Sequence, residues 1–167
     1  ALPIAESLVE RLRELKQVKQ AEVAGSLRRR RETIGDVDLI CAPADHDTGA
    51  AEAVAAAFVK FPEVERILGQ GSTKASVVTA GGLQVDLRIV PAENFGAALL
   101  YFTGSKEHNV RLRGRALDMG RTLNEWGLYR LSEYEPVSMP TGGKTKGKAT
   151  PGKASKKTGE APAAKAV

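Results

Sequence analysis

Two aspartates one residue apart open the apolar run 36–41, and this run constrains the fold more than any other stretch. Side chains alternate between the two faces of an extended chain, so Asp36 and Asp38 share one face while Val37 and Leu39 share the other. Two carboxylates on one face of a buried strand repel each other and lose hydration, which requires a cation close by. A pair of divalent metal ions about 3.5–4 Å apart, as found in phosphoryl and nucleotidyl transfer sites, meets that requirement.

Each part of this region has an ordinary explanation when it is taken alone. An Asp-x-Asp pair is most often a turn or a surface edge, Gly25-Ser26 is common loop material, and the arginine run 28–31 can be a solvated basic face. The parts occur in a fixed order, however, and a third aspartate, Asp86, stands in a second strand-like run. The combination favours a metal-dependent nucleotidyl transfer site.

Composition limits the kinds of protein that this chain can be. Its 167 residues, 42% of them hydrophobic, suffice for one domain with a core and an appendage. No apolar run approaches the ~20 residues of a membrane span, and no secretory signal opens the chain. The single cysteine, Cys41, excludes an internal disulfide and fits a reducing cytoplasm, so we expect a cytoplasmic protein without a membrane partner. Because residue 1 is Ala, we expect the chain to be part of a longer protein.

The net charge of +5 is unevenly distributed. Residues 1–131 carry 18 Lys and Arg against 17 Asp and Glu, a net of +1, whereas residues 132–167 carry 7 Lys against 3 Glu, a net of +4. From Pro140 onward the sequence lacks aromatic residues and is rich in Gly, Lys, Thr, Ala and Pro, which predicts a disordered basic tail. In the first part, arginines cluster at 28–31 and 111–121. Clustered cations beside an acidic site suit a polyanion whose phosphates lie along one face.

Hydrophobic periodicity predicts a chain of mixed helices and strands. The predicted helices lie at 3–18, 47–60, 94–103 and 106–118, and the predicted strands at 21–24, 36–41, 64–68, 75–79 and 83–90, with a short strand pair within 121–131. A polar loop over 27–35 is expected to end in a strained turn at Gly35. Gly81-Gly82 predicts a tight hairpin that brings Asp86 beside the two aspartates of the earlier strand.

Several motifs together carry a resemblance to a known family. Gly25-Ser26, followed after nine residues by Asp-x-Asp in a strand, is the signature of the nucleotidyltransferase fold. The motifs downstream are Val85-Asp86-Leu87-Arg88, Tyr101-Phe102-Thr103-Gly104-Ser105, Asn109, Arg113 and Asn124-Glu125. With them, residues 5–131 resemble the family X DNA polymerases and are most similar to the bacterial branch.

The resemblance implies an α+β fold in three parts. Residues 1–92 would be a nucleotidyltransferase palm, a mixed β-sheet with two flanking helices. Residues 93–131 would be a small helical subdomain with a short β-hairpin that contacts the nucleotide and the template. Residues 132–167 would be a basic, disordered linker or tail.

The resemblance also implies the roles of individual residues. Asp36 and Asp38 would bind two Mg²⁺ or Mn²⁺ ions, and Asp86 would bind only the catalytic ion and accept the proton of the primer 3′-hydroxyl. The residues expected to bind the nucleotide are Gly25, Ser26, Arg29, Gly35, Tyr101, Phe102, Gly104 and Asn109. The residues expected to bind DNA are Arg111, Arg113 and Arg115. The peptide bond after Gly104 is cis in the family, and the same is expected here.

The chain departs from the family pattern at two positions and lacks two domains. Gln84 stands where eukaryotic relatives usually carry an Arg that steadies the catalytic carboxylate, and Lys106 replaces an acidic residue of some relatives. An N-terminal helix-hairpin-helix domain and a C-terminal metallophosphoesterase domain, to which the basic tail would be the tether, are expected in the parent chain.

The function implied by the resemblance is template-directed DNA synthesis from a dNTP on primer-template or gapped DNA, as in gap filling during base-excision or break repair. A nucleotidyltransferase acting on a non-DNA acceptor is the alternative, although the basic helical extension over 94–131 suits a nucleic acid duplex better. A DNA-binding module with a decayed site is a third hypothesis, which the intact Asp36, Asp38 and Asp86 disfavour.

Overall fold

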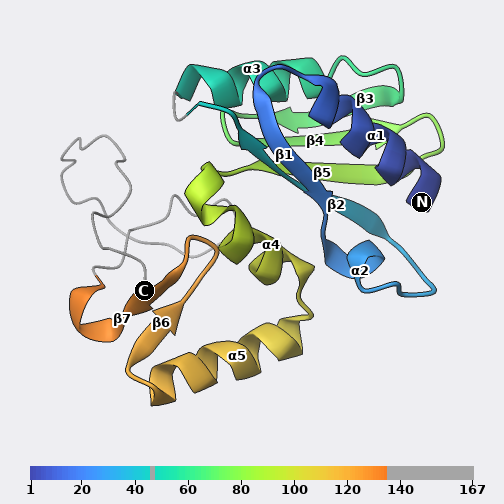
Figure 1. The fold of residues 1–167 in the computed structure, drawn as a ribbon. Coiled ribbons are helices and arrows are strands. Elements are labelled where there is room, and N and C mark those ends of the chain that lie inside the picture. Colours follow the sequence, from blue (N-terminus) through green and yellow to red (C-terminus); the bar gives the residue numbers. More distant parts are fainter. Residues whose placement is uncertain (46–47, 135–167) are drawn as a thin grey trace, which may run out of the picture.

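The computed structural model describes residues 1–45 and 48–134 as an α+β fold with a five-stranded sheet and a two-stranded one (Figure 1). Of the tail predicted from residue 132, all but the first three residues lie outside the described part. The elements are α1 (Leu2–Glu14), β1 (Val18–Val23), α2 (Gly25–Arg28), β2 (Asp36–Pro43), α3 (Thr48–Phe58), β3 (Val64–Gln70), β4 (Lys74–Thr79), β5 (Gln84–Ile89), η1 (Ala92–Asn94), α4 (Phe95–Thr103), α5 (Lys106–Asp118), β6 (Arg121–Leu123), β7 (Leu128–Arg130) and η2 (Leu131–Glu133). Within the described residues, no helix has both the length and the apolar character that a bilayer crossing needs.

The larger sheet has the order β1-β2-β5-β4-β3 and is mixed, because β2 and β5 run parallel while the other neighbours run antiparallel. The parallel pair is in register, so the buried Leu39 lies opposite the buried Leu87. Strand β4 returns to β5 through a tight connection, in which Gly82 has a φ of 77° and donates its N–H to the Thr79 carbonyl at 2.8 Å. The hairpin predicted at Gly81-Gly82 is therefore confirmed, and it delivers β5 to the middle of the sheet.

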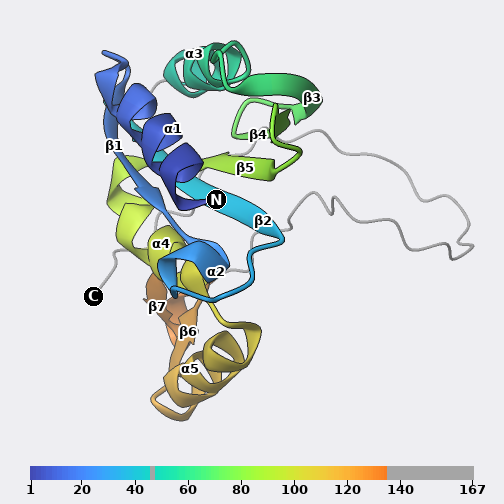
Figure 2. The same ribbon diagram turned by 90° about the vertical axis from the view of Figure 1, so that its right-hand side faces the viewer.

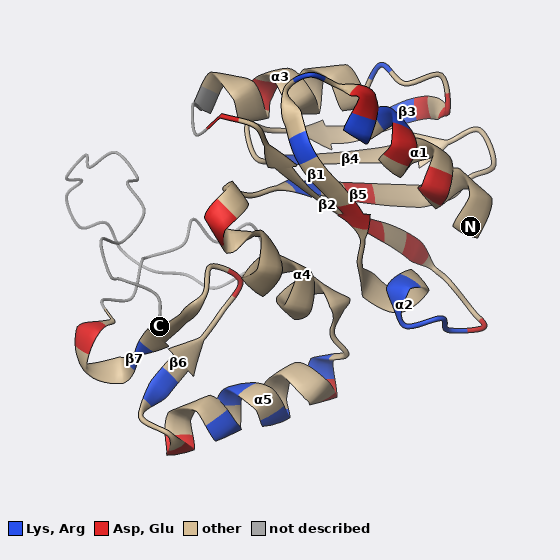
Figure 3. Cartoon of the chain, viewed as in Figure 1, with Lys and Arg blue, Asp and Glu red and all other residues tan. Residues whose placement is uncertain are grey.

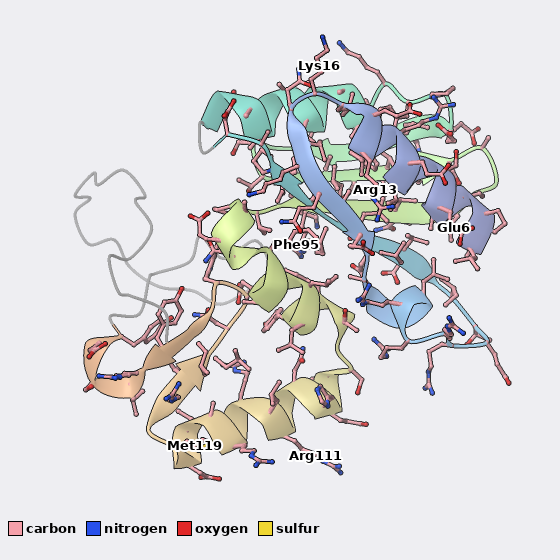
Figure 4. The ribbon with its side chains drawn as sticks, viewed as in Figure 1. Glu6, Arg13, Lys16, Phe95, Arg111 and Met119 are labelled. Carbon is pink, nitrogen blue, oxygen red and sulfur yellow. The ribbon has the colours of Figure 1, made fainter. Side chains whose placement is uncertain are left out.

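Alternation along β2 gives the sheet two different faces. Val37, Leu39 and Cys41 are fully buried in the main core, which α1 and α3 cover. Ile40 points to the opposite face, where a smaller core cluster includes Phe95 of α4 (Figure 4). The turned view shows α1 and α3 over one side of the sheet and α4 on the other (Figure 2). Burial of apolar side chains on both faces fixes the direction of every β2 side chain, including the two aspartates.

The first helix and the first strand differ from the prediction. Helix α1 ends at Glu14 rather than at residue 18, because Leu15 takes an extended conformation and its carbonyl accepts the N–H of Val18 at 2.9 Å. Strand β1 accordingly begins at Val18 instead of residue 21 and pairs with Pro43 of β2. A β-branched residue suits a pleated, half-buried strand better than a helix end, which explains the shift.

The segment between β1 and β2 also differs from the prediction. It begins with one helical turn, α2, where part of a polar loop was expected. Gly35 does not have a positive φ, so the strained turn predicted there is wrong. The residues of this segment with a positive φ are Gly25, at 59°, and Arg30, at 55°.

Helices α4 and α5 and the β6–β7 hairpin follow the sheet, as predicted. Ser105 caps α5, as its hydroxyl accepts the His108 N–H at 3.4 Å. The hairpin is tied back to η1 through Asn94, whose amide donates to the Trp126 carbonyl at 2.5 Å. The side-chain oxygen of Asn124 accepts the N–H groups of Trp126 and Gly127 and holds the turn between β6 and β7. These bonds give the subdomain a fixed shape although it has few buried side chains.

A half-buried carboxylate connects α1 to the turn before β3. Glu63 Oε1 accepts the Ser7 hydroxyl at 2.8 Å and Arg11 Nε at 2.7 Å. Burial acts to raise the pKa of Glu63, but the hydrogen bonds from Arg11 and Ser7 outweigh it and hold that pKa below its ordinary value. Because the pKa of Glu63 is lower in the folded chain than in the unfolded chain, its ionised form stabilises the fold at pH values above the unfolded-state pKa. This stabilisation is lost as the pH falls through the folded-state pKa.

We therefore expect Glu63→Gln to lower the free energy of unfolding by about 1 kcal/mol at pH 7. The difference from the unmodified chain should shrink as the pH falls below about 4. Urea denaturation at pH 7 and at acidic pH measures both values. Glu6→Gln is the matched control, because Glu6 is exposed on α1, the helix that Glu63 contacts (Figure 4). A stability loss in Glu63→Gln that is independent of pH would contradict the ionic role.

Candidate active site

Three carboxylates meet on the sheet face that α1 and α3 do not cover. Asp38 of β2 lies directly opposite Asp86 of β5, and Asp36 lies opposite Gln84, in the parallel register. Asp36 is exposed, whereas Asp38 and Asp86 are half-buried. The predicted juxtaposition of the three aspartates is therefore confirmed, and the parallel register of the two strands produces it.

The acidic cluster changes the protonation of its central member. Burial raises the pKa of Asp38, and the charges of Asp36 and Asp86 raise it further. Arg88 and Lys74 act in the opposite direction without cancelling the increase. A cation bound beside such an aspartate would stabilise its ionised form.

Asp86 uses both of its oxygens in contacts with neighbouring side chains. Gln84 Nε2 donates to Oδ1 at 3.4 Å, and Lys74 Nζ lies 3.8 Å from Oδ2. Within residues 1–45 and 48–134, no three Asp, Glu, His or Cys side chains are arranged so that they could already hold a metal ion. By the chemistry of its donors, however, a set of three carboxylates fits a hard divalent cation such as Mg²⁺ or Mn²⁺.

Gly25 brings the backbone of α2 against the acidic cluster. Its φ is 59°, and a Cβ at this position would overlap the carboxylate of Asp38. The preceding residue is anchored to β2, because the Ala24 N–H donates to the Asp38 carbonyl at 2.8 Å. The chain therefore needs a residue without a side chain at this position, and the next residue, Ser26, stands beside the carboxylates.

Arg29 links this segment to the end of α4. Its Nη1 donates a hydrogen bond to the carbonyl of Thr103. The same nitrogen would lie 3.2 Å from a Cβ at Gly104, whose φ is 67°. The Gly104-Ser105 peptide bond is cis, as predicted. Arg29 therefore stands at the junction between the sheet and the two following helices.

A cavity of about 540 Å³ lies between the sheet and α5. It is lined by Gly25, Ser26, Arg29, Asp36, Asp38, Tyr101, Phe102, Gly104, Ser105, Lys106, Asn109, Val110 and Arg113. Most of the residues predicted to bind metal, nucleotide or DNA are thus brought together around one space. Asn109 is fixed at its wall, because its amide donates to the Tyr101 carbonyl at 2.7 Å.

Four predicted site residues are absent from the lining of the cavity, namely Asp86, Gly35, Arg111 and Arg115. Asp86 borders the cavity residue Asp38, and Gly35 precedes Asp36 in an exposed position. Arg111 and Arg115 lie one helical turn apart on α5 and are both exposed. Figure 3 shows several basic positions along this helix, and Figure 4 labels Arg111.

Sequence reasoning missed one cation beside the aspartates, Lys74, which forms an ion pair with Asp86. The guanidinium of Arg88, on β5, lies 4.3 Å from the centre of the Phe102 ring, so β5 contacts α4 through this side chain. Lys74 could have been found from the sequence, because the predicted hairpin and the alternation in β4 put it on the face of Asp86. Its contact with the carboxylate depends on side-chain conformation and could not have been predicted.

Comparisons with known proteins identify DNA polymerases as similar to this chain. Residues 98–155 match the DNA polymerase beta thumb family. The DNA polymerase/3′-5′ exonuclease PolX of Bacillus subtilis is 34% identical over 143 residues, which are 84% of this chain and 24% of that protein. The matching family model and this relative both carry DNA polymerase names, which supports the resemblance to the family X DNA polymerases.

Two solved structures of Leishmania infantum polymerase beta share the fold of this chain. The ternary P/T complex has a TM-score of 0.67 at 30% identity, covering 78% of this chain and 56% of that one. The ternary gap complex has a TM-score of 0.66 at 28% identity, covering 78% of this chain and 49% of that one. The chain thus spans about a quarter of the curated relative and about half of the structural relatives.

Proposed function

We propose that this chain is the catalytic part of a template-directed DNA polymerase, which transfers a nucleotide from a dNTP to a primer 3′-hydroxyl. Within it, residues 1–92 would be the palm and residues 93–131 the subdomain that contacts nucleotide and template. The observation that carries the proposal is the register of β2 and β5, which sets Asp38 against Asp86 at the edge of a cavity walled by α4 and α5. Relatives named as DNA polymerases support the same activity.

Asp36, Asp38 and Asp86 would hold Mg²⁺ or Mn²⁺, with two ions as the family resemblance implies. A divalent ion bound there neutralises charge on the phosphates and lowers the pKa of the attacking hydroxyl. The half-buried Asp86 would accept the proton of the primer hydroxyl on its carboxylate. The remaining work of the chain is positioning, because phosphoryl transfer needs little covalent chemistry from a protein.

Different residues of the cavity wall would contact the triphosphate, the sugar and the base of the nucleotide. The backbone and hydroxyl of Gly25-Ser26 and the guanidinium of Arg29 would bind the triphosphate, because N–H groups and a planar guanidinium suit phosphate oxygens. Tyr101 and Phe102, whose rings meet edge to face with centres 5.2 Å apart, would lie against the sugar. Asn109 would lie next to the new base pair.

The exposed basic row of α5 would contact DNA. Arg111 and Arg115, four residues apart, form this row and are exposed, whereas Arg113, also exposed, lies on another face of α5 and lines the cavity. Charges one helical turn apart can follow the phosphates of one strand. The two Leishmania structures are a ternary P/T complex and a ternary gap complex, which supports gapped DNA as the partner and gap filling in repair as the setting.

Primer extension on a duplex with a one-nucleotide gap tests the proposal. With Mg²⁺ or Mn²⁺ we expect the complementary dNTP to be incorporated, with at least a tenfold preference over the other three because pairing with the template selects it. Chelation of the metal should stop the reaction. Incorporation of all four nucleotides at equal rates, or transfer only to an acceptor other than DNA, would contradict template-directed synthesis and favour the alternative nucleotidyltransferase.

A further inference from the structure

Among the described residues, Lys74 is the cation that forms an ion pair with the acidic cluster. Its ammonium group lies 3.8 Å from Oδ2 of Asp86, while Gln84 donates to Oδ1 from the same strand. Arg88, the other cation on this face, is engaged differently, since its guanidinium lies over the ring of Phe102. Each oxygen of the Asp86 carboxylate therefore has its own partner from the chain.

The strands fix both partners of Asp86. In the antiparallel β4–β5 pair, Ser76 lies opposite Asp86 and Lys74 opposite Arg88, so Lys74 is a diagonal neighbour of the carboxylate. Ala75, next to Lys74, is fully buried, which forces the lysine to the face of the aspartates. Gln84 precedes Asp86 by two residues and shares the same face.

An ammonium group and a divalent cation cannot share one carboxylate oxygen without strong repulsion. The contact with Lys74 is also consistent with the arrangement of the described residues, in which no three Asp, Glu, His or Cys side chains are placed so that they could already hold a metal ion. The Lys74 side chain is 45% exposed, so it can leave the carboxylate and remain hydrated. Removal of Lys74 from Asp86 therefore needs no rearrangement of the core.

We propose that Lys74 is the resident counterion of Asp86, which occupies this carboxylate in the metal-free chain and must release it before Asp86 can bind a divalent cation. This inference rests on the proposed role of Asp86 as a metal ligand. Gln84 would keep its hydrogen bond to Oδ1 and limit how far the carboxylate turns. Lys74 thus lowers the affinity for the catalytic ion, the one of the two ions that Asp86 would bind, and it acts as a positioning residue.

Binding of Mn²⁺ to the chain without DNA or nucleotide tests the inference independently of catalysis. Free Mn²⁺ is measured by electron paramagnetic resonance during a titration. We expect Lys74→Met to tighten binding by about 3- to 5-fold, the size expected for a partly exposed ion pair, and Lys74→Arg to bind as the unmodified chain does. Unchanged affinity in Lys74→Met would overturn the inference.

Two further variants separate direct contact from a general effect of charge. Lys106→Met removes a cation from the wall of the cavity that contains Asp36 and Asp38, where it forms no ion pair with either, and should change affinity less than Lys74→Met does. In an Asp86→Asn background, Lys74→Met should have no effect, because the contact is already lost. Equal tightening by the two lysine substitutions, or an undiminished effect in the Asp86→Asn background, would overturn the role of Lys74. Wild-type Mn²⁺ binding by Asp86→Asn itself would instead contradict the proposed metal site.

Discussion

Replacement of Asp86 by alanine is expected to reduce nucleotide incorporation on a gapped duplex by about 10³- to 10⁴-fold. The reason is that Asp86 would be both a metal ligand and the acceptor of the primer proton, whereas Asp36 and Asp38 would still hold the metal of the nucleotide. Single-turnover primer extension measures the rate, and calorimetry in the presence of Mn²⁺ measures nucleotide affinity, which should change little. The half-buried carboxylate is flanked by Lys74 and Gln84, so its removal should not unfold the chain.

Asp118→Ala is the matched control for the loss of one acidic side chain. Asp118 is exposed at the end of α5 and does not line the cavity, so incorporation should stay close to that of the unmodified chain. Near wild-type extension by Asp86→Ala would rule out the mechanism. An equal loss in Asp118→Ala would show that net charge, rather than the carboxylate at the site, controls the rate.

Gly25→Ala is expected to impair the site and the fold together. An alanine at a φ of 59° costs about 1–2 kcal/mol of backbone energy, and its Cβ would displace the carboxylate of Asp38. We expect the free energy of unfolding to fall by about 1–3 kcal/mol. Incorporation should fall by about 100-fold, since small displacements of catalytic groups have large effects on rate. Urea denaturation and single-turnover extension measure the two effects.

Gly96→Ala provides the comparison for this substitution. Gly96 lies in α4 with ordinary helical geometry, and a Cβ there would have no neighbour within 4 Å. Alanine is the better helix former, so this variant should be as stable as the unmodified chain or more stable by up to about 1 kcal/mol. If Gly25→Ala behaved like Gly96→Ala, the close approach of α2 to Asp38 would not matter for the site.

The part of the fold that carries the carboxylates could be predicted from the sequence. Alternation in β2 assigns Asp36 and Asp38 to one face because the residues between and after them must be buried. The hairpin at Gly81-Gly82 depends on local backbone chemistry, so it too is visible in the sequence. Together these two signals imply that Asp86 joins the pair.

Other features depend on interactions that no local pattern contains. Helix α2 is a single turn of four residues, too short for a periodic signal, and the packing of Gly25 on Asp38 sets its start. Arg29 reaches a carbonyl at the end of α4, far along the chain, so only the assembled fold makes this bond visible. The strained turn was predicted at Gly35, but the positive φ is at Arg30. A glycine shows where the backbone can adopt a positive φ, whereas the assembled fold decides where one is required.

The parallel register of β2 and β5 has a consequence for how the chain can change length during evolution. Helix α3, strand β3 and their connections lie between Asp38 and Asp86, and residues inserted at these surface turns would leave the pair of strands unchanged. One residue inserted within β5 ahead of Asp86 would instead turn the aspartate into the core and bring Val85 to its place. Homologues should therefore vary freely in the length of this intervening segment, yet keep the same residue spacing within each of the two strands.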